Sequence, residues 1–385
     1  MYSQNTLLIP GDFPPVVSGI ATYFYQIWRL LLKENNYILC PKDPDWEKCD
    51  HSLALNTIRR RIPSGDATRD KLFKGLLYAF WTLILHRKHH FRRIHCGQVL
   101  SSGFAGWLMN KLYGVPYIVY VYGSETFRFG RSRLLSKFIK VFLNNAEWII
   151  PNSHFTRDEF LALDLPPEKF RIITPGVDTC IFRPMKKDPA LVQKHGLSDK
   201  TVLLTVARLD ERKGHDVVIR AVADLASQFP KLVYLIVGRG REETRLRQLS
   251  KDLNVADRVI FCGYVDDLEL PKFYNLCDIF ILLNRQTSAD PRLRGDYEGF
   301  GIVFLEASAC GKPVIAGNFG GVASAVEHDR SGFITDSTNP ITVKSTIVSL
   351  IKNQTLMNQL GQYGLQRARK SFDWQIISEE INKIL

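Results

Sequence analysis

The sequence predicts an α/β protein with two doubly wound domains, each built on a parallel sheet. Short apolar runs typical of buried strands alternate along the chain with segments of helical periodicity. The 385 residues are too many for one ordinary core, so two domains are expected. The composition, 45% hydrophobic and 23% charged, is that of an ordinary globular protein.

The expected strands are apolar runs that end at turns. In the first half they are residues 6–10, 116–123, 146–153 and 170–178, and a helical pattern covers residues 18–33. In the second half they are residues 201–209, 231–240, 258–265, 277–283 and 312–317. Helical segments separate most of these runs, which favours parallel strands with helices on both faces of each sheet.

The boundary between the domains is expected near residues 176–200. This stretch is rich in Pro, Lys and Asp and precedes a fresh strand. We therefore assign residues 1–180 to a first domain and residues 181–371 to a second. Doubly wound sheets bind ligands at the carboxyl ends of their strands, where loops meet the N-termini of helices, so the turns after the strands are the places to look for a site.

Several classes of protein are disfavoured by the sequence. The longest predominantly apolar run, residues 76–85, is too short to cross a bilayer as a helix. The N-terminus lacks the basic and long apolar regions of a signal peptide, so we expect a cytoplasmic protein. The seven cysteines include no C-x-x-C pair, which argues against a disulfide framework or a zinc site.

Polar and glycine signals follow three strands of the second domain. Arg208 and Lys213 lie near a helix start, where two cations suit a diphosphate, although on their own they are better explained as solvated surface charges. Gly238 lets the backbone approach a ligand, and the backbone from Gly263 to Val265 can line a slot for a base. Ordinary turns also explain these glycines. A P-loop is disfavoured because no G-x-x-x-x-G-K-S/T motif occurs.

The stretch EGFGIVFLE carries the strongest signal. Gly299 and Gly301 predict that a helix begins near Ile302, which leaves Glu298 on the preceding loop and Glu306 one turn into the helix. The amide groups at such a helix start form an anion site, and carboxylates accept hydrogen bonds from sugar hydroxyls. The alternative is a helix-start carboxylate favoured by the dipole, with Glu306 merely exposed.

These motifs resemble those of the retaining nucleotide-sugar glycosyltransferases of family four, which have the GT-B fold. The resemblance covers nearly the whole chain. It includes E-x7-E from Glu298 to Glu306, R-x4-K from Arg208 to Lys213, and the stretch GDFPPVVSGIATYFYQIWRLL with Gly19 in its glycine-rich turn on the acceptor side. TPGVDTCIFRP is similar to the interdomain connection of the family. Residues 372–385 resemble its C-terminal helix, which packs back on the first domain.

The resemblance implies two Rossmann-like domains that face each other across a cleft. It also implies that Arg208 and Lys213 stabilise the diphosphate leaving group, that Glu298 contacts the hydroxyls of the donor sugar, and that Glu306 contacts the ribose. The backbone at Gly299, Phe300, Gly301, Ile302 and Val303 would hold the phosphates. Such enzymes retain the anomeric configuration. They use a GDP- or UDP-linked sugar as co-substrate, with neither a divalent metal nor another cofactor.

One motif departs from the family pattern. The stretch VYGSETF has Tyr122 where the family often places a histidine, and Glu125 matches the acid of that turn. Tyr122 can donate a hydrogen bond but cannot be a cation near neutral pH. These two residues complete the predicted catalytic set, unless Tyr122 is simply an aromatic residue at a strand end.

The stretch GFGIVFLEASACGKPVIAGNFGG resembles the corresponding sequence of phosphatidylinositol-mannoside-type α-mannosyltransferases. This resemblance favours transfer of mannose from GDP-mannose to a lipid-linked or cell-envelope glycan acceptor. One alternative is a UDP-sugar-dependent transferase of polysaccharide biosynthesis. Another, from a different functional class, is a non-catalytic subunit that binds a nucleotide-sugar.

The positive charge of the first domain is concentrated in one stretch. Residues 59–93 contain ten Lys and Arg against two Asp and Glu, and residues 69–97 mix these cations with aromatic and aliphatic residues. This pattern suits peripheral contact with an anionic membrane, on the inner face of the plasma membrane. In the alternative, residues 76–85 pack inward and only their flanks are basic. No recognised nucleic-acid motif accompanies the charge, so no nucleic-acid partner is expected.

Overall fold

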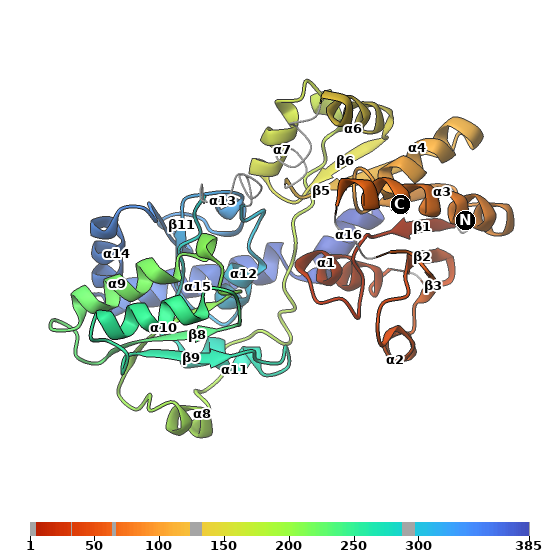
Figure 1. The fold of residues 1–385 in the computed structure, drawn as a ribbon. Helices are drawn as coiled ribbons and strands as arrows, with labels where there is room; N and C mark the ends of the chain where they lie inside the picture. The colour runs from red at the N-terminus through yellow and green to blue at the C-terminus, as the bar shows by residue number, and fades with distance from the viewer. Residues whose placement is uncertain (1–4, 32, 64–66, 124–132, 287–296, 385) are drawn as a thin grey trace. The chain divides into compact units, whose positions relative to one another are not determined.

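The computed structural model describes residues 5–31, 33–63, 67–123, 133–286 and 297–384 (Figure 1). The chain forms two compact units. Unit 1 comprises residues 1–175 and 374–385, and unit 2 comprises residues 176–373. From the sequence we placed the divisions after residues 180 and 371, whereas the chain changes units after residues 175 and 373.

Unit 1 is built on a six-stranded parallel sheet. Its strands are β1 (Thr6–Ile9), β2 (Asn36–Pro41), β3 (Asn56–Arg60), β4 (Arg93–Cys96), β5 (Tyr117–Val121) and β6 (Trp148–Pro151). Their order in the sheet is β3-β2-β1-β4-β5-β6, which is the order of a Rossmann-like domain. The chain therefore reverses its direction of winding between the neighbouring strands β1 and β4.

Helices cover both faces of this sheet. They are α1 (Gly19–Trp28), α2 (Trp46–Leu53), α3 (Thr68–His89), α4 (Ser102–Tyr113), α6 (Arg133–Asn145), α7 (His154–Leu161) and α16 (Trp374–Asn382), with 3-10 turns η1 (Lys33–Asn35) and η2 (Pro167–Lys169). Strand side chains alternate between the two faces. Leu7 and Ile9 pack with α3, α4 and α6, whereas Leu8 packs with α1 and α16.

Unit 2 repeats this architecture. Its strands are β7 (Thr201–Val206), β8 (Leu232–Val237), β9 (Val259–Gly263), β10 (Ile279–Leu282), β11 (Val314–Gly317) and β12 (Gly332–Thr335). They are ordered β12-β11-β10-β7-β8-β9, so the winding reverses between the neighbouring strands β7 and β10. Two doubly wound Rossmann-like sheets confirm the predicted fold class.

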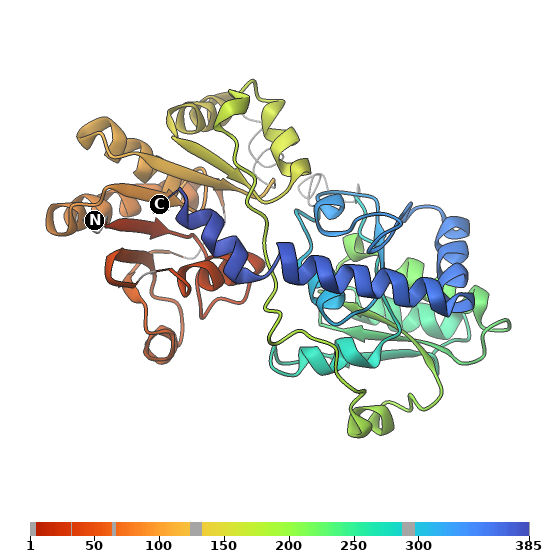
Figure 2. The same cartoon turned by 180° about the vertical axis from the view of Figure 1, so that it is seen from behind.

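The helices of unit 2 also form two layers. They are α8 (Pro189–Lys194), α9 (His215–Leu225), α10 (Glu243–Asp252), α11 (Leu270–Leu276), α12 (Ile302–Ala309), α13 (Val322–Ala325), α14 (Pro340–Lys352) and α15 (Gln354–Ser371), with the 3-10 turn η3 (Glu211–Lys213). Leu204 packs with α11 and α12, and its neighbour Leu203 packs with α9, α10 and α14. Figure 2 shows α15 as the long blue helix of unit 2, and this helix packs against α12.

Two predicted elements differ in the structure. Residues 170–178 were expected to form a strand, but they make only isolated bridges, from Phe170 to Ile149 and from Val177 to Asp373. This segment is where the chain passes from unit 1 into unit 2, so its backbone cannot stay in one ladder. The helix expected over residues 18–33 ends at Trp28, where α1 has already buried Phe24 and Ile27.

The two crossings between units are joined to each other within unit 2. The amide of Val177 donates to the carbonyl of Phe372 at 2.7 Å. The Asp373 carboxylate accepts from both the amide and the hydroxyl of Thr179. The first crossing is therefore hydrogen-bonded to the residues just before the second.

The described part of the chain contains no helix with the length and hydropathy needed to span a membrane. All seven cysteines are free thiols, and Cys180 is exposed.

Candidate active site

The predicted donor-site residues of unit 2 follow strands that meet at the reversal point of the sheet. Arg208 and Lys213 follow β7, and Glu298 precedes α12 on the segment that follows β10. Ligands of doubly wound sheets bind at this place, because the loops from two neighbouring strands separate there and leave room between them.

Lys213 and Glu298 form an ion pair in which Lys213 is buried and Glu298 is half-buried. The Lys213 ammonium donates to Glu298 Oε2, and Arg212 Nη1 lies 3.5 Å from the same oxygen. The Lys213 residue is only 9% exposed. Burial lowers the pKa of the Lys213 ammonium, an effect that the carboxylate opposes. Burial alone would raise the pKa of Glu298, but Lys213 and Arg212 outweigh it and hold that pKa below its ordinary value. Glu298 is therefore ionised at neutral pH.

The backbone that holds Lys213 is fixed against the end of β10. The amide of Arg285 donates to the carbonyl of Arg212 at 2.8 Å, and the Arg285 guanidinium contacts both carboxylate oxygens of Asp216 at 3.0 Å. Gly214 has φ +67°, and a Cβ there would lie 2.1 Å from the carbonyl oxygen of Leu283. A glycine is thus required for the two loops to approach this closely.

The backbone of Glu298 is held from the other side by the loop after β11. The amide of Gly321 donates to the carbonyl of Glu298 at 2.7 Å. A Cβ on Gly320 would lie 2.3 Å from that carbonyl oxygen, and Gly320 has φ +88°. Residues from three separate loops therefore set the position of this one carboxylate.

The glycine turn after Glu298 starts a helix where the sequence predicted. Gly301 is the N-cap of α12 with φ +90°, and the helix begins at Ile302. Phe300 is buried, and its ring packs against Phe372 with centroids 6.1 Å apart. Phe300 can therefore offer a ligand only its backbone, whereas the first amide groups of α12, at Ile302 and Val303, belong to the turn that attracts anions.

Glu306 lies in a different environment from Glu298. It is half-buried on α12, and its Oε2 accepts a hydrogen bond from the buried Tyr274 hydroxyl at 2.5 Å. Burial raises the pKa of Glu306 to about 7, a direction that the nearby Asp267 carboxylate reinforces. The two acids of the motif thus differ: Glu298 is held ionised by cations, and Glu306 is poised to titrate near neutral pH.

Arg208 does not join the ion pair of Lys213 and Glu298. Its side chain is 69% exposed and contacts Asp210 at 3.1 Å. Its carbonyl lies 3.3 Å from Nε2 of His215, a buried residue whose Nδ1 lies 3.1 Å from the Tyr234 hydroxyl. Burial lowers the pKa of His215 to about 4, so this histidine is neutral and acts as a support for the loop.

The other predicted contacts of unit 2 have structural reasons for their residue types. Gly238 has φ +134°, and a Cβ there would lie 2.0 Å from the carbonyl oxygen of Ala207. This glycine is required by the packing of two strand ends, whatever it also binds. Val265 is half-buried and packs against the core on the α11 and α12 side of the sheet.

Three predicted residues belong to unit 1. Gly19 is the first residue of α1, and a Cβ there would meet nothing within 4 Å. The preceding Ser18 accepts from the amide of Ala21 at 3.1 Å and donates to Asp12 at 3.0 Å. Tyr122 follows β5 and makes an edge contact with Tyr23 at 6.5 Å. Glu125 lies outside the described residues.

Sequence reasoning missed Arg212, Arg285 and Asp216. An arginine beside the predicted Lys213 was visible in DERKG, but nothing in the sequence shows that its partner lies 86 residues later. The described residues hold no cluster of three or more His, Cys, Asp or Glu side chains suited to a metal ion.

Two family models match consecutive parts of the chain. Residues 17–180 match the model described as Glycosyltransferase Family 4, and residues 187–367 match Glycosyl transferases group 1. A GDP-mannose-dependent alpha-(1-6)-phosphatidylinositol monomannoside mannosyltransferase of Mycobacterium tuberculosis is 33% identical over 99% of this chain and 98% of its own length. This chain is a family 4 glycosyltransferase. The predicted family and enzyme class are thereby confirmed.

Other relatives of this family 4 glycosyltransferase carry similar names. The Mycolicibacterium smegmatis protein of the same name is 28% identical over 98% of this chain and 97% of its own length. A GDP-mannose-dependent monoacylated alpha-(1-6)-phosphatidylinositol monomannoside mannosyltransferase of Corynebacterium glutamicum is 32% identical over 100% of this chain and 98% of its own length.

Solved structures share the fold of this glycosyltransferase. Anabaena HepE, crystallised with UDP, superposes with a TM-score of 0.80 at 20% identity and 99% coverage of both chains. Sucrose-phosphate synthase from Thermosynechococcus elongatus gives a TM-score of 0.79 at 23% identity, covering 99% of this chain and 98% of its own. The GT-B fold implied by the motifs is confirmed.

Proposed function

We propose that this family 4 glycosyltransferase transfers mannose from GDP-mannose to a mannosylated phosphatidylinositol or a related lipid-linked glycan. We infer the donor and the acceptor from similarity to mannosyltransferases named for these substrates, at 28–33% identity over nearly the full length. The ion pair and the helix start in unit 2 supply a chemistry that fits the reaction.

The leaving group of the reaction is a nucleoside diphosphate, and three features of unit 2 can stabilise its charge. The amide groups at the start of α12 attract anions. Lys213 lies buried at the same reversal point of the sheet, and Arg208 adds an exposed guanidinium on the same loop. Fixed positive charge at a departing diphosphate stabilises the transition state more than the ground state.

Glu298 contacts the hydroxyls of the donor sugar in this proposal. A carboxylate can accept two hydrogen bonds from vicinal hydroxyls only while it is ionised. The ion pair with Lys213 and Arg212 keeps it so. Glu306, one turn into α12, takes the ribose hydroxyls, and its hydrogen bond from Tyr274 fixes the orientation of the carboxyl group.

The reaction retains the anomeric configuration and uses neither a divalent metal nor a resident cofactor in this proposal. The cations and the helix start perform the charge stabilisation that a metal ion supplies in other transferases. The nucleotide-sugar is a co-substrate. Closure of the protein around the bound nucleotide-sugar would exclude water and so suppress hydrolysis of the donor.

The donor and acceptor are tested by mass spectrometry of the product. The purified full chain is incubated with GDP-mannose, UDP-glucose or UDP-N-acetylglucosamine, and with vesicles that contain phosphatidylinositol monomannoside or lack it. We expect one added hexose only with GDP-mannose and the acceptor, in EDTA as well as without it. NMR of the product then shows an α linkage. Transfer from a UDP-sugar alone would reject the donor, and transfer abolished by EDTA would reject metal independence.

The exposed face of α3 supports the membrane contact. Leu72, Leu76, Phe80 and Ile84 recur at every fourth position and are all exposed, so they form one stripe along the helix, which we call the α3 stripe. The opposite face, with Tyr78 and Leu85, is buried in the core of unit 1. One face of α3 therefore packs inward, and the other remains exposed and available for the proposed contact.

Basic residues flank the α3 stripe at both ends. Arg69 and Lys74 lie in the first two turns of α3, and Arg87 and Lys88 lie in its last turn. Apolar side chains with cations at both ends suit the interface of an anionic bilayer, where each basic residue contributes roughly 1 kcal/mol. We propose that this stripe brings the enzyme to its lipid acceptor, on the inner face of the plasma membrane.

Vesicle sedimentation tests this contact. We expect the chain to sediment with vesicles that contain anionic lipid and to stay in solution with neutral ones. The double variant Leu76→Ser, Phe80→Ser should lose sedimentation. The matched control is Ile341→Ser, which changes an exposed isoleucine of α14 in unit 2. Equal, negligible binding to both kinds of vesicle would reject the contact.

A further inference from the structure

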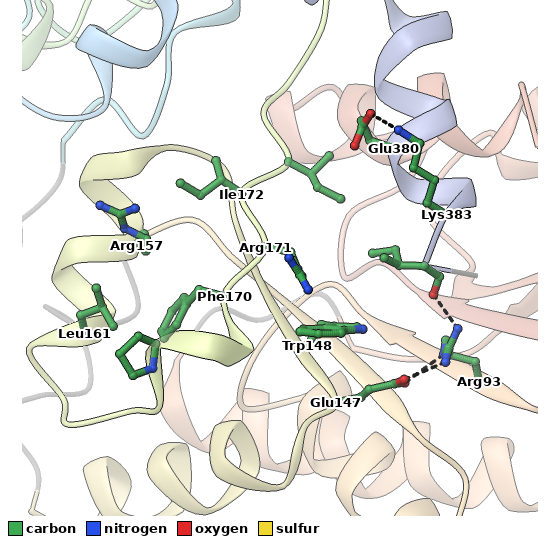
Figure 3. A pocket seen from close by; sticks show the side chains of 13 residues that line it. Arg93, Glu147, Trp148, Arg157, Leu161, Phe170, Arg171, Ile172, Glu380 and Lys383 are labelled. Atoms are coloured by element: carbon green, nitrogen blue, oxygen red, sulfur yellow. Dashed lines mark hydrogen bonds and ion pairs between the residues drawn. The ribbon is translucent and has the colours of Figure 1, made fainter.

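Unit 1 contains a pocket of about 770 Å³ that the proposed reaction does not use. It is lined by residues of β6, α7 and α16 and of the segment that follows η2 (Figure 3). Arg93 and Trp148 are the first residues of β4 and β6, so the pocket lies at the edge of the sheet where strands start. Tyr122 follows the end of β5 and therefore belongs to the opposite edge.

The pocket combines an apolar lining with a cationic centre. Trp148, Leu161, Phe170 and Ile172 provide aromatic and aliphatic surface. Figure 3 shows Arg171 beside the Trp148 ring in the middle of the pocket, and the guanidinium lies 4.4 Å from the ring centroid. A volume of this size is typical of small-molecule sites, which are mostly apolar with a few polar groups that fix orientation.

The charges of the lining are not balanced. Four cations and two carboxylates line the pocket. Arg93 is already satisfied, because it contacts Glu147 at 2.8 Å and donates to the carbonyl of Ile384 at 2.6 Å. Lys383 pairs with Glu380 at 2.6 Å. Arg171, by contrast, makes no ion pair with any residue that the structure describes, and stacking on Trp148 leaves the edge of its guanidinium available.

We propose that this pocket binds an anionic amphiphile, a molecule with a phosphate or carboxylate group joined to an apolar chain. The anion would be held by the Arg171 guanidinium, because a planar fork of donors matches such oxygens. Arg157 of α7 also lines the pocket, but it already contacts Asp158 at 2.8 Å. The apolar chain would lie on Trp148, Phe170 and Leu161. A free amphiphile and the head region of a membrane lipid both have this chemistry.

The ligand would contact two parts of unit 1 that adjoin the crossings of the chain. Ile172 and Ile173 line the pocket and precede the crossing after Pro175. Lys383 and Ile384 also line it, and they follow α16, which begins just after the crossing at Trp374. Binding would therefore join segments that are more than 200 residues apart in the sequence.

Calorimetric titration of the full chain tests the proposal with three probes: octyl phosphate below its micellar concentration, inorganic phosphate, and octyl glucoside as a neutral amphiphile. We expect octyl phosphate to bind at least about tenfold more tightly than either of the others, since a charge-assisted contact adds to apolar burial. Arg171→Gln should weaken octyl phosphate binding by about tenfold or more. The matched control, Arg220→Gln on an exposed position of α9 in unit 2, should leave it unchanged.

Two further measurements on Arg171→Gln identify the source of the ligand and show whether the variant is folded. If Arg171→Gln also reduces sedimentation with anionic vesicles, the ligand is a membrane lipid; if it does not, the ligand is a free amphiphile. GDP binding by Arg171→Gln should equal that of the unaltered chain, which shows that the variant is folded and that the donor site is separate. Absence of octyl phosphate binding, or equal binding by Arg171→Gln and the unaltered chain, would overturn the proposal.

Discussion

Lys213 donates a hydrogen bond to the carboxylate of Glu298 at the point where the sheet of unit 2 reverses its winding, and the two side chains are only 10% and 16% exposed. Arg212 approaches the same carboxylate oxygen. Two cations thus surround one acid in a place where a sugar diphosphate carries hydroxyls and negative charge side by side. Donor binding would bring the diphosphate to Lys213, while Arg212 keeps Glu298 ionised.

Removal of the Lys213 charge should therefore affect chemistry more than folding. Lys213→Met leaves Arg212 as the partner of Glu298, so we expect a folded protein whose kcat falls by roughly 10²–10³-fold, the usual effect of losing one group that stabilises a developing anion. Steady-state kinetics with GDP-mannose measure this loss. Lys231→Met, at an exposed position, is the control and should keep full activity. Equal activity of the two variants would contradict the role of Lys213 at the leaving group.

Glu306 should make nucleotide binding depend on pH. Its pKa of about 7 means that the carboxyl is largely protonated at pH 6 and largely ionised at pH 8. A carboxylate accepts ribose hydroxyls better than a protonated acid does, so GDP affinity should rise as pH passes through 7. Calorimetry across this range measures the change, and Glu306→Gln should remove it. A pH dependence that persists in Glu306→Gln would assign it to another group.

The same carboxyl should lower stability at higher pH. The folded-state pKa of about 7 lies above the ordinary value of 4.5, so the folded chain binds the proton more tightly than the unfolded chain does. The contribution of this group to the free energy of unfolding therefore falls as pH rises from about 4.5 to about 7. Thermal unfolding should show Glu306→Gln to be more stable than the unaltered chain at pH 8, with the difference shrinking towards pH 5. A difference that grows towards pH 5 would contradict this sign.

A substitution at Gly320 tests whether the backbone position of Glu298 affects stability and transfer. Gly320→Ala places a Cβ against the carbonyl oxygen of Glu298 at a positive φ, and we expect a loss of about 1–3 kcal/mol in the free energy of unfolding, together with reduced transfer. Gly114→Ala is the matched control, since Gly114 also has a positive φ but open space around a Cβ. Denaturant unfolding and kinetics compare the two. If both alanines cost the same, the crowding at Glu298 has no effect of its own.

The sequence was sufficient for the fold class and for the residue at which α12 begins. Alternating apolar runs placed the central strands β1, β5, β7, β8 and β10, because these are buried on both faces. The glycines at 299 and 301 placed the start of α12, and Gly301 is indeed its N-cap, with φ +90°. Both signals are local, so no long-range contact was needed to read them.

The missed elements depend on their surroundings. The edge strand β3 has the sequence NTIRR, which pairs with β2 although little of it is apolar. The strand β4 has four residues inside the most basic stretch of the chain. The ion pair between Arg285 and Asp216 joins residues 69 positions apart. Sequence patterns contain no information on such partners, and the same holds for the burial that raises the pKa of Glu306.

The role of Glu298 in transfer is tested most directly by the transfer rate of Glu298→Gln, compared with the affinity of this variant for GDP. Glutamine has the size of glutamate but cannot accept hydrogen bonds with both terminal atoms or neutralise Lys213. We expect mannose transfer to fall by at least about 10²-fold, while the Kd for GDP changes by less than about threefold. Transfer at a nearly normal rate in a folded Glu298→Gln protein would contradict this role of Glu298.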